Sequence, residues 1–452
     1  MARLSLFCRA QPPFLLLAHA RLAAPTDPWP LFMPPALPPD SLALALWHAA
    51  PIVAQVMEGQ SLADGALEQV PGEIRPAVQD IVYGTLRRYG EGEALLAPLL
   101  QNPPYPIIRA LLFCALHRLA TWTDAPHTVV NQAVEAASQL DEGRYKGLVN
   151  GVLRNYLRQQ ESLEQGLADH PAARLWHPGW WLERLQASYP DQWDSIVSAD
   201  NTPPPMSLRV NLRKGSQADY LAQLEASGIA AQARGEAGIR LQRPVPVTQL
   251  PGFAQGLASV QDLGAQRAAE LLDPAPGSRV LDACAAPGGK TAHLLERADL
   301  ELTALDIDPA RCRQIESNLA RLDLAARVRC GDASAPRAWG REPAAFDAIL
   351  ADVPCSASGV VRRHPDAKWL RQPQDILKFA YTQRRILERL WSALQPGGKL
   401  LYATCSVFPE ENGEQVAKFL SRTADARLLS EEQWLPGPEH DGFYYALLQK
   451  LA

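Results

Sequence analysis

The second half of the chain alternates between short apolar runs and amphipathic segments, and this alternation limits the possible folds more than any other feature. From Gly277 onward, five apolar runs predict strands and three segments between them have helical periodicity. The predicted strands are Arg279–Cys284, Leu302–Ile307, Ala326–Cys330, Phe346–Asp352 and Lys399–Ala403, and the predicted helices are Gly289–Ala298, Pro309–Leu322 and Pro373–Leu394. Such alternation is typical of a mostly parallel, doubly wound sheet of the Rossmann-like type.

Two cysteines lie just beyond the ends of two predicted strands. Cys355 follows the run that ends at Asp352, within Asp-Val-Pro-Cys-Ser, and Cys405 follows the run that ends at Ala403, within Ala-Thr-Cys-Ser. Ligands of open α/β sheets bind at the carboxyl ends of the strands, and neighbouring strands lie only ~5 Å apart. If the two strands are neighbours, both thiols overlook one pocket, where a thiolate can attack an electron-poor ring carbon. The alternative of two buried core thiols is disfavoured by the adjacent Asp and Pro residues.

Composition excludes several classes of protein. The chain has 452 residues, 47% of them hydrophobic, which suffices for several domains with their own cores. Its seven cysteines form no Cys-x-x-Cys pair, which argues against a zinc site or a disulfide framework and predicts a cytoplasmic protein without metal. No apolar run approaches the ~20 residues of a membrane helix. The net charge of -5 means that any surface for nucleic acid must be local.

The chain upstream of the alternating region divides into three parts. Residues 1–40 contain a short, interrupted apolar run and a proline-dense stretch, which predict a disordered or mis-assigned leader. Residues 41–165 predict an all-α bundle, residues 166–275 a helical connector with a small α/β subdomain, and residues 276–452 the catalytic domain. The bundle helices are expected at Ser41–Glu58, Arg75–Tyr89, Ile107–Thr121, Thr128–Leu140 and Tyr145–Gln160.

A glycine-rich turn follows the first predicted strand of the alternating region. It consists of Cys284, Ala285, Ala286, Pro287, Gly288, Gly289 and Lys290. The turn lacks the spacing of a phosphate-binding loop, and it suits a ligand with a carboxylate and an adenosine group. Asp306, at the next strand end, is placed to bond the ribose hydroxyls, with Asp308 as the close competitor, and Asp332 is placed to accept from an adenine amine. Any one of these acids alone could instead be a helix cap.

These motifs resemble those of the S-adenosylmethionine-dependent RNA cytosine-5 methyltransferases. The similarity rests on the turn Asp282–Thr291, the two cysteine motifs and the upstream Val260-Gln261-Asp262 with Ala265-Gln266. The helical part, with Asn150-Gly151-Val152-Leu153-Arg154, is similar to the NusB-type RNA-binding fold. The resemblance covers the chain from about residue 41 onward and implies a class I methyltransferase domain that uses S-adenosylmethionine.

The resemblance also implies a role for each residue of the cysteine motifs. Cys405 is the thiol that adds to carbon 6 of cytosine, Cys355 assists proton removal from carbon 5 and release, and Asp352 bonds the N3 edge of the base. In the DNA cytosine-5 enzymes the cysteine after proline is the nucleophile, which would nominate Cys355 instead. The Thr-Cys-Ser setting favours Cys405.

The segment after Cys355 is rich in basic residues. Arg362, Arg363, Lys368 and Arg371 follow the cysteine directly, and we expect them to contact RNA phosphates beside the target base. Trp369 or His364 could stack on a neighbouring base. The alternative is a solvated basic helix face.

The resemblance implies that the substrate is a cytosine of 16S ribosomal RNA, either naked or in an early assembly intermediate, and that the enzyme is a monomer. Three other functions stay open at this point. They are a tRNA cytosine-5 methyltransferase, a non-catalytic RNA-binding factor that kept the fold, and a DNA cytosine methyltransferase, although no large target-recognition segment separates the two cysteine motifs.

Overall fold

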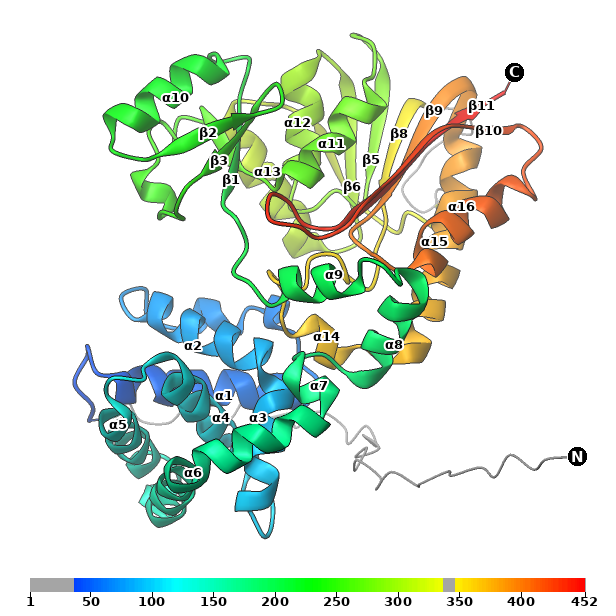
Figure 1. The fold of residues 1–452 in the computed structure, drawn as a ribbon. Helices are drawn as coiled ribbons and strands as arrows, with labels where there is room; N and C mark the ends of the chain where they lie inside the picture. Colours follow the sequence, from blue (N-terminus) through cyan, green and yellow to red (C-terminus); the bar gives the residue numbers. More distant parts are fainter. Residues whose placement is uncertain (1–35, 336–345, 452) are drawn as a thin grey trace, which may run out of the picture.

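The structure is a computed structural model that describes residues 36–335 and 346–451. A helical bundle, a small four-stranded sheet and a seven-stranded sheet follow one another along the chain (Figure 1). The predicted multidomain class, an all-α bundle followed by a small α/β subdomain and a Rossmann-like domain, is confirmed. The predicted leader lies almost entirely within residues 1–35, outside the described residues.

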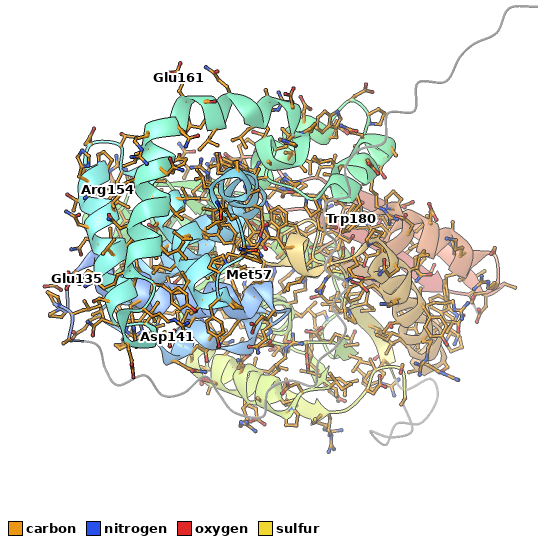
Figure 2. All side chains as sticks on the ribbon, turned by 90° about the horizontal axis from the view of Figure 1, so that it is seen from below. Met57, Glu135, Asp141, Arg154, Glu161 and Trp180 are labelled. Atoms are coloured by element: carbon orange, nitrogen blue, oxygen red, sulfur yellow. The ribbon has the colours of Figure 1, made fainter. Side chains whose placement is uncertain are left out.

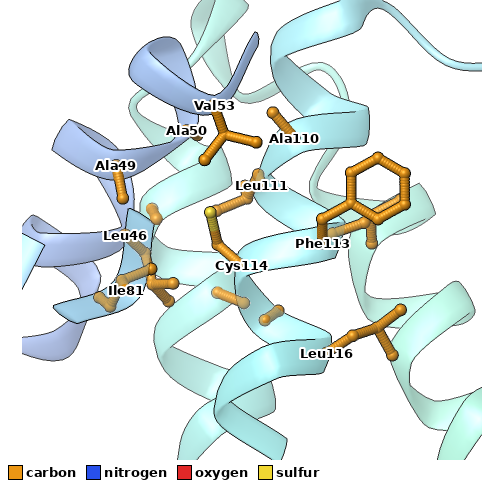
Figure 3. Close-up of a cluster of buried hydrophobic side chains, with 14 of the residues drawn as sticks. Leu46, Ala49, Ala50, Val53, Ile81, Ala110, Leu111, Phe113, Cys114 and Leu116 are labelled. Carbon is orange, nitrogen blue, oxygen red and sulfur yellow. The ribbon is translucent and has the colours of Figure 1, made fainter. Parts of the chain in front are cut away.

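The bundle forms because each helix carries a broad apolar face. Its helices are α1 Leu42–Met57, α2 Arg75–Arg87, α3 Tyr89–Leu96, α4 Pro106–Thr121, α5 Pro126–Ser138 and α6 Lys146–Gly166. Helix α4 lies at the centre, and Cys114 is enclosed by apolar side chains of α1, α2 and α4 (Figure 3). The outer face of α6 is polar, with Arg154 and Glu161 pointing outward (Figure 2).

Helix α3 is absent from the sequence prediction, because Gly90 and Gly92 read as a turn. Both glycines are instead required by close packing within the helix. A Cβ on Gly90 would lie 2.8 Å from the Trp369 ring, and one on Gly92 would lie 2.8 Å from the Phe113 ring. The contact of Gly90 with Trp369 joins the bundle to the catalytic part of the chain.

The connector and the small subdomain link the bundle to the large sheet. The connector helices are α7 Pro171–Arg174, α8 Gly179–Ser188 and α9 Trp193–Asp200. The four-stranded antiparallel sheet has the order β2-β3-β1-β4 and carries helix α10 Gln217–Ala226. Its strands are β1 Ser207–Val210, β2 Ala231–Arg234, β3 Gly238–Leu241 and β4 Ala258–Val260. Helices α8 and α9 lie between the bundle and the seven-stranded sheet (Figure 1).

The seven-stranded sheet has the order β10-β11-β9-β8-β5-β6-β7. Its parallel strands are β5 Arg279–Ala283, β6 Glu301–Asp306, β7 Arg327–Cys330, β8 Phe346–Asp352 and β9 Leu394–Thr404. The helices of this domain are α11 Leu263–Leu272, α12 Gly289–Arg297, α13 Pro309–Leu322, α14 Ala367–Leu370, α15 Pro373–Ala393 and α16 Gly413–Leu420. All five parallel strands end at the same edge of the sheet, so the predicted site residues converge there.

Two antiparallel strands extend the sheet beyond the prediction. Strand β11 Phe443–Lys450 pairs with β9 on one side and with β10 Ala426–Trp434 on the other. The exposed edge strand β10 contains Ser, Gln and Glu residues, which favour strands weakly. The short apolar run of β11 does not distinguish a buried strand from a buried helix.

Candidate active site

The two cysteines lie side by side at the carboxyl edge of the large sheet. Strands β8 and β9 are parallel neighbours, with Asp352 opposite Ala403, as the sequence argument required. The Sγ atoms of Cys355 and Cys405 are 3.3 Å apart, and both residues are partly exposed free thiols. A hydrogen bond with Cys405, together with burial, raises the pKa of Cys355 well above its ordinary value. Cys355 therefore keeps its proton at neutral pH.

A partly buried ion pair lies beside the thiols. The Lys290 Nζ atom is 2.6 Å from Asp352 Oδ2. Burial acts to lower the pKa of Lys290, but the Asp352 carboxylate outweighs burial, and the pKa lies above its ordinary value. Cys405 also interacts electrostatically with this ammonium group. The site thus supplies a fixed positive charge next to one of its two thiols.

The glycine-rich turn begins helix α12 at the same edge. Gly288 is the N-cap residue of this helix, with φ of +96°, and a Cβ there would lie 3.3 Å from Ile315. The amide of Ala286 donates to Asp306 Oδ2 at 3.1 Å. The conformation brings the backbone of the turn close to the strand ends.

The three predicted acids have different environments. Asp306 is buried at the end of β6, whereas Asp308 is exposed and caps α13 by accepting from the amides of Ala310 and Arg311. Asp332 follows β7 and accepts from the amide and hydroxyl of Ser334. The cap role of Asp308 leaves Asp306 as the better candidate for a ligand contact.

The buried Asp282, on β5 beneath the turn, should make the free energy of unfolding depend on pH. One carboxylate oxygen accepts from Thr291 at 2.5 Å, and the other has no hydrogen-bond partner among the described residues. Burial raises the pKa of Asp282 to about 7 from 3.8. The pKa of Asp282 is higher in the folded protein than in the unfolded chain. The contribution of Asp282 to the free energy of unfolding is therefore fully present below about pH 4 and is lost as the pH rises through about 7.

We therefore expect the free energy of unfolding of the wild type to fall with rising pH relative to that of Asp282→Asn. The difference should change by up to about 4 kcal/mol between pH 4 and 8. Urea unfolding of both proteins across this range measures it. Parallel curves for the two proteins would show that Asp282 titrates normally.

The structure corrects the role predicted for two of the basic residues after Cys355. Arg362 is 2% exposed and pairs with Asp441, and Lys368 is completely buried. Lys368 Nζ donates to the carbonyl of Arg87 at 3.2 Å, and burial lowers its pKa to about 7. Neither side chain can contact RNA phosphates in this arrangement. Arg362 is held by Asp441 and the carbonyl of Gly437, and Lys368 lies between the bundle and the connector, where it also donates to Asn201.

The other residues of this segment are also engaged within the protein, to different extents. Arg363 pairs with Asp262 and Asp441, and Arg371 Nε donates to the carbonyl of Ser356 at 3.4 Å, although both arginines are partly exposed. Trp369 donates to the carbonyl of Leu86 at 2.6 Å and is committed to the bundle, whereas His364 is exposed. The sequence shows the basic composition of a segment but not which of its charges the fold has already neutralised.

Arg209 of β1 is a structural determinant of the site that sequence reasoning missed. Its buried guanidinium donates to both carboxylate oxygens of Glu296, at 2.7 and 2.8 Å, and to the carbonyl of Gly289 at 2.9 Å. It also bonds Gln261, which belongs to the upstream motif. Arg209 therefore fixes both ends of helix α12 to the small subdomain.

Replacing Arg209 with leucine should lower the free energy of unfolding by about 3–5 kcal/mol, because Glu296 is left buried without its partner. Arg213→Leu is the matched control, since Arg213 pairs with the exposed Asp299, and it should cost less than about 1 kcal/mol. Urea unfolding measures both values. Equal losses in the two variants would contradict this role of Arg209.

Within residues 36–335 and 346–451, no three or more His, Cys, Asp or Glu side chains are arranged to hold a metal ion. In the same residues, no helix has both the length and the apolar character needed to cross a membrane.

Three stretches of the chain match models of known protein families. Residues 269–449 match the 16S rRNA methyltransferase RsmB/F family, residues 177–248 match the ferredoxin-like domain of RsmF/B-like methyltransferases, and residues 48–158 match the NusB family. Curated relatives are named ribosomal RNA small subunit methyltransferase B. The one from Vibrio cholerae is 46% identical, covering 89% of this chain and 96% of its own, and the one from Vibrio vulnificus is 44% identical, covering 89% and 99%.

Fold and sequence together define an RNA methyltransferase. The chain belongs to the RsmB/F family of 16S rRNA methyltransferases, and the relatives it resembles over nearly their whole length are the small-subunit methyltransferases B. This finding confirms the predicted RNA methyltransferase with a NusB-like helical part.

Solved structures share the architecture. The crystal structure of PH0851 covers 92% of this chain with a TM-score of 0.77 and 22% identity, which shows the common fold. A methyltransferase homologue from Pyrococcus horikoshii covers 62% of this chain and 97% of its own, with a TM-score of 0.55 and 30% identity.

Proposed function

We propose that this methyltransferase transfers a methyl group from S-adenosylmethionine to carbon 5 of a cytosine in 16S ribosomal RNA, through a covalent bond between Cys405 and carbon 6 of the base. The observation that carries the proposal is the pair of thiols 3.3 Å apart beside the Lys290–Asp352 ion pair. Two thiols suit a reaction that must both make and break a bond to the same ring.

The residues around the turn suit S-adenosylmethionine. Asp306 accepts backbone bonds from Ala286 and Asp308 and forms a long ion pair with Arg311 at 3.7 Å, which leaves its carboxylate capacity for ribose hydroxyls. Ile307, 64% exposed beside it, offers an apolar surface to an adenine ring. The N-terminus of α12 suits a carboxylate, and the turn residues Cys284 to Lys290 together with Asp332 and Asp352 complete the candidate set. The bound cofactor would supply an electrophilic methyl group.

The protein residues divide the chemistry between them. The thiolate of Cys405, stabilised by the nearby Lys290 ammonium, adds to carbon 6 while Asp352 bonds the N3 edge of the base. Carbon 5 then has enamine character and takes the methyl group. Once Cys405 is bonded to carbon 6, its hydrogen bond no longer holds the proton on Cys355, which can pass that proton to water and assist removal of the proton from carbon 5. The bond from Cys405 to carbon 6 then breaks and the aromatic ring is restored.

The helical bundle and the rim of the site are candidates for RNA contacts. Arg154 and Arg158 are exposed on α6, and Arg363 and Arg371 are partly exposed near the cysteines. In an acidic chain such local basic groups are the available partners for phosphates. The proposal also includes that the protein is a monomer and that it acts in the cytoplasm.

The test is to identify the methylated atom and RNA. The protein is incubated with methyl-labelled S-adenosylmethionine and either unmodified 16S RNA, assembled small subunits or tRNA, and the RNA is digested to nucleosides. The proposal predicts label in 5-methylcytidine from 16S RNA. Label in another nucleoside, or only in tRNA, would contradict it, and the comparison of naked RNA with subunits identifies the natural form of the substrate.

A further inference from the structure

A buried glutamate joins the two cysteine loops. Glu411 lies in the turn after Cys405 and is completely buried. Its Oε1 atom accepts from the amide of Ser356 at 2.9 Å and from Gln383 Nε2 at 3.0 Å. Its Oε2 atom accepts from the hydroxyls of Ser356 at 2.5 Å and Ser406 at 2.6 Å. Ser356 and Ser406 directly follow Cys355 and Cys405, so one carboxylate holds both loops.

Neighbouring groups make this connection rigid. Gln383 of α15 also donates to the carbonyl of Pro354, the residue before Cys355. Asn412 accepts from the hydroxyl of Thr404 at 2.6 Å and donates to the carbonyl of Ser406 at 2.8 Å, so it bonds on both sides of Cys405. The hydroxyl of Ser358 bridges those of Ser356 and Ser406, at 3.0 and 2.9 Å. Buried polar networks rigidify the groups that they connect, and here Gln383 Oε1 is a member without a hydrogen-bond partner among the described residues.

An ionised carboxylate matches this set of donors. It provides about four acceptor positions on two oxygens and no proton of its own, and here four donors use them. Burial raises the pKa of Glu411, and the hydrogen bonds from Ser356, Ser406 and Gln383 oppose that shift. Its neighbour Glu410 instead pairs with Arg184 near the surface, so the two consecutive glutamates have different roles.

We propose that Glu411 is a positioning residue that clamps the loops of Cys355 and Cys405 together, and thereby sets the thiol separation needed to form and resolve the RNA adduct. The role in the reaction rests on the function proposed above. The clamping of the two loops does not, because it concerns the protein alone. Displacement of catalytic groups by about 1 Å can reduce rates about 100-fold.

The first test measures thiol proximity without RNA or cofactor. Diamide oxidises the reduced protein, taking two electrons and two protons from the thiols, and the Cys355–Cys405 linked peptide is quantified by mass spectrometry over time. We expect Glu411→Leu to form this disulfide at least about tenfold more slowly than the wild type, because disulfide bonding has strict geometric limits. Glu411→Gln, which keeps part of the hydrogen bonding, should be intermediate. The control Glu414→Gln, at an exposed pair with Lys418, should match the wild type.

The second test measures the reaction. Glu411→Leu should lower kcat about 100-fold or more with a KM for RNA within about threefold of the wild type, which a general loss of structure would not produce.

Wild-type rates in both assays for Glu411→Leu would overturn the proposal, and so would slower disulfide formation with an unchanged kcat. If Glu411→Leu does not fold, Ser406→Ala takes its place, and unchanged rates in that variant overturn the proposal. A wild type that does not methylate cytosine refutes the proposed function, while the disulfide rates still test the clamp.

Discussion

Replacing Cys405 with alanine is expected to reduce methyl transfer by on the order of 10,000-fold or more, because no other group in the site can form the bond to carbon 6. The thiol of Cys355 lies 3.3 Å away but is held in its protonated form by its hydrogen bond with Cys405 and by burial. Single-turnover assays with methyl-labelled S-adenosylmethionine and 16S RNA measure the loss.

Two controls show that such a loss is chemical. Equilibrium binding of S-adenosylmethionine to Cys405→Ala should stay within about threefold of the wild type, because the pocket itself is intact. Cys114→Ala, which removes a free thiol from the core of the helical bundle, outside the proposed machinery, should keep wild-type activity. Substantial methyl transfer by Cys405→Ala would show that another group is the nucleophile.

Replacing Lys290 with methionine should have the second largest effect. The change removes the positive charge that pairs with Asp352 at 2.6 Å and that interacts with Cys405. We expect kcat/KM to fall by about 100- to 1,000-fold, since a thiolate beside an unpaired carboxylate is harder to form.

Lys399→Met is the matched control for this experiment. Lys399 lies in the middle of β9, six residues before Cys405, so its loss should leave kcat/KM unchanged. A kcat/KM of Lys290→Met within about threefold of the wild type would show that the reaction does not need the charge of Lys290.

The convergence of the site could be predicted from the sequence because it follows from strand direction. Once Phe346–Asp352 and Lys399–Ala403 are recognised as parallel strands, their ends must share one edge, and adjacency of β8 and β9 brings Cys355 to Cys405. The glycine-rich turn and the strand-end acids follow from the same rule. These features depend on local patterns and on topology, both of which the sequence encodes plainly.

The remaining features depend on burial and on contacts between distant segments. Lys368 and Arg362 have the composition of an RNA-binding loop, yet they are interior because Leu86, Arg87 and Asp441 come from elsewhere in the chain to meet that loop. Glu410 and Glu411 are adjacent residues of the same type. Only the fold shows that Glu411 is buried between the cysteine loops and that Glu410 pairs with Arg184 near the surface.

Trapping of the covalent protein–RNA adduct tests the central claim most directly. Cys355→Ala and Cys405→Ala are each incubated with 16S RNA and S-adenosylmethionine, separated on a denaturing gel, and the cross-linked peptide is mapped. We predict that Cys355→Ala accumulates an adduct through Cys405, because release is impaired, and that Cys405→Ala forms none. An adduct through Cys355 in the Cys405→Ala protein would contradict the account and reverse the roles of the two thiols.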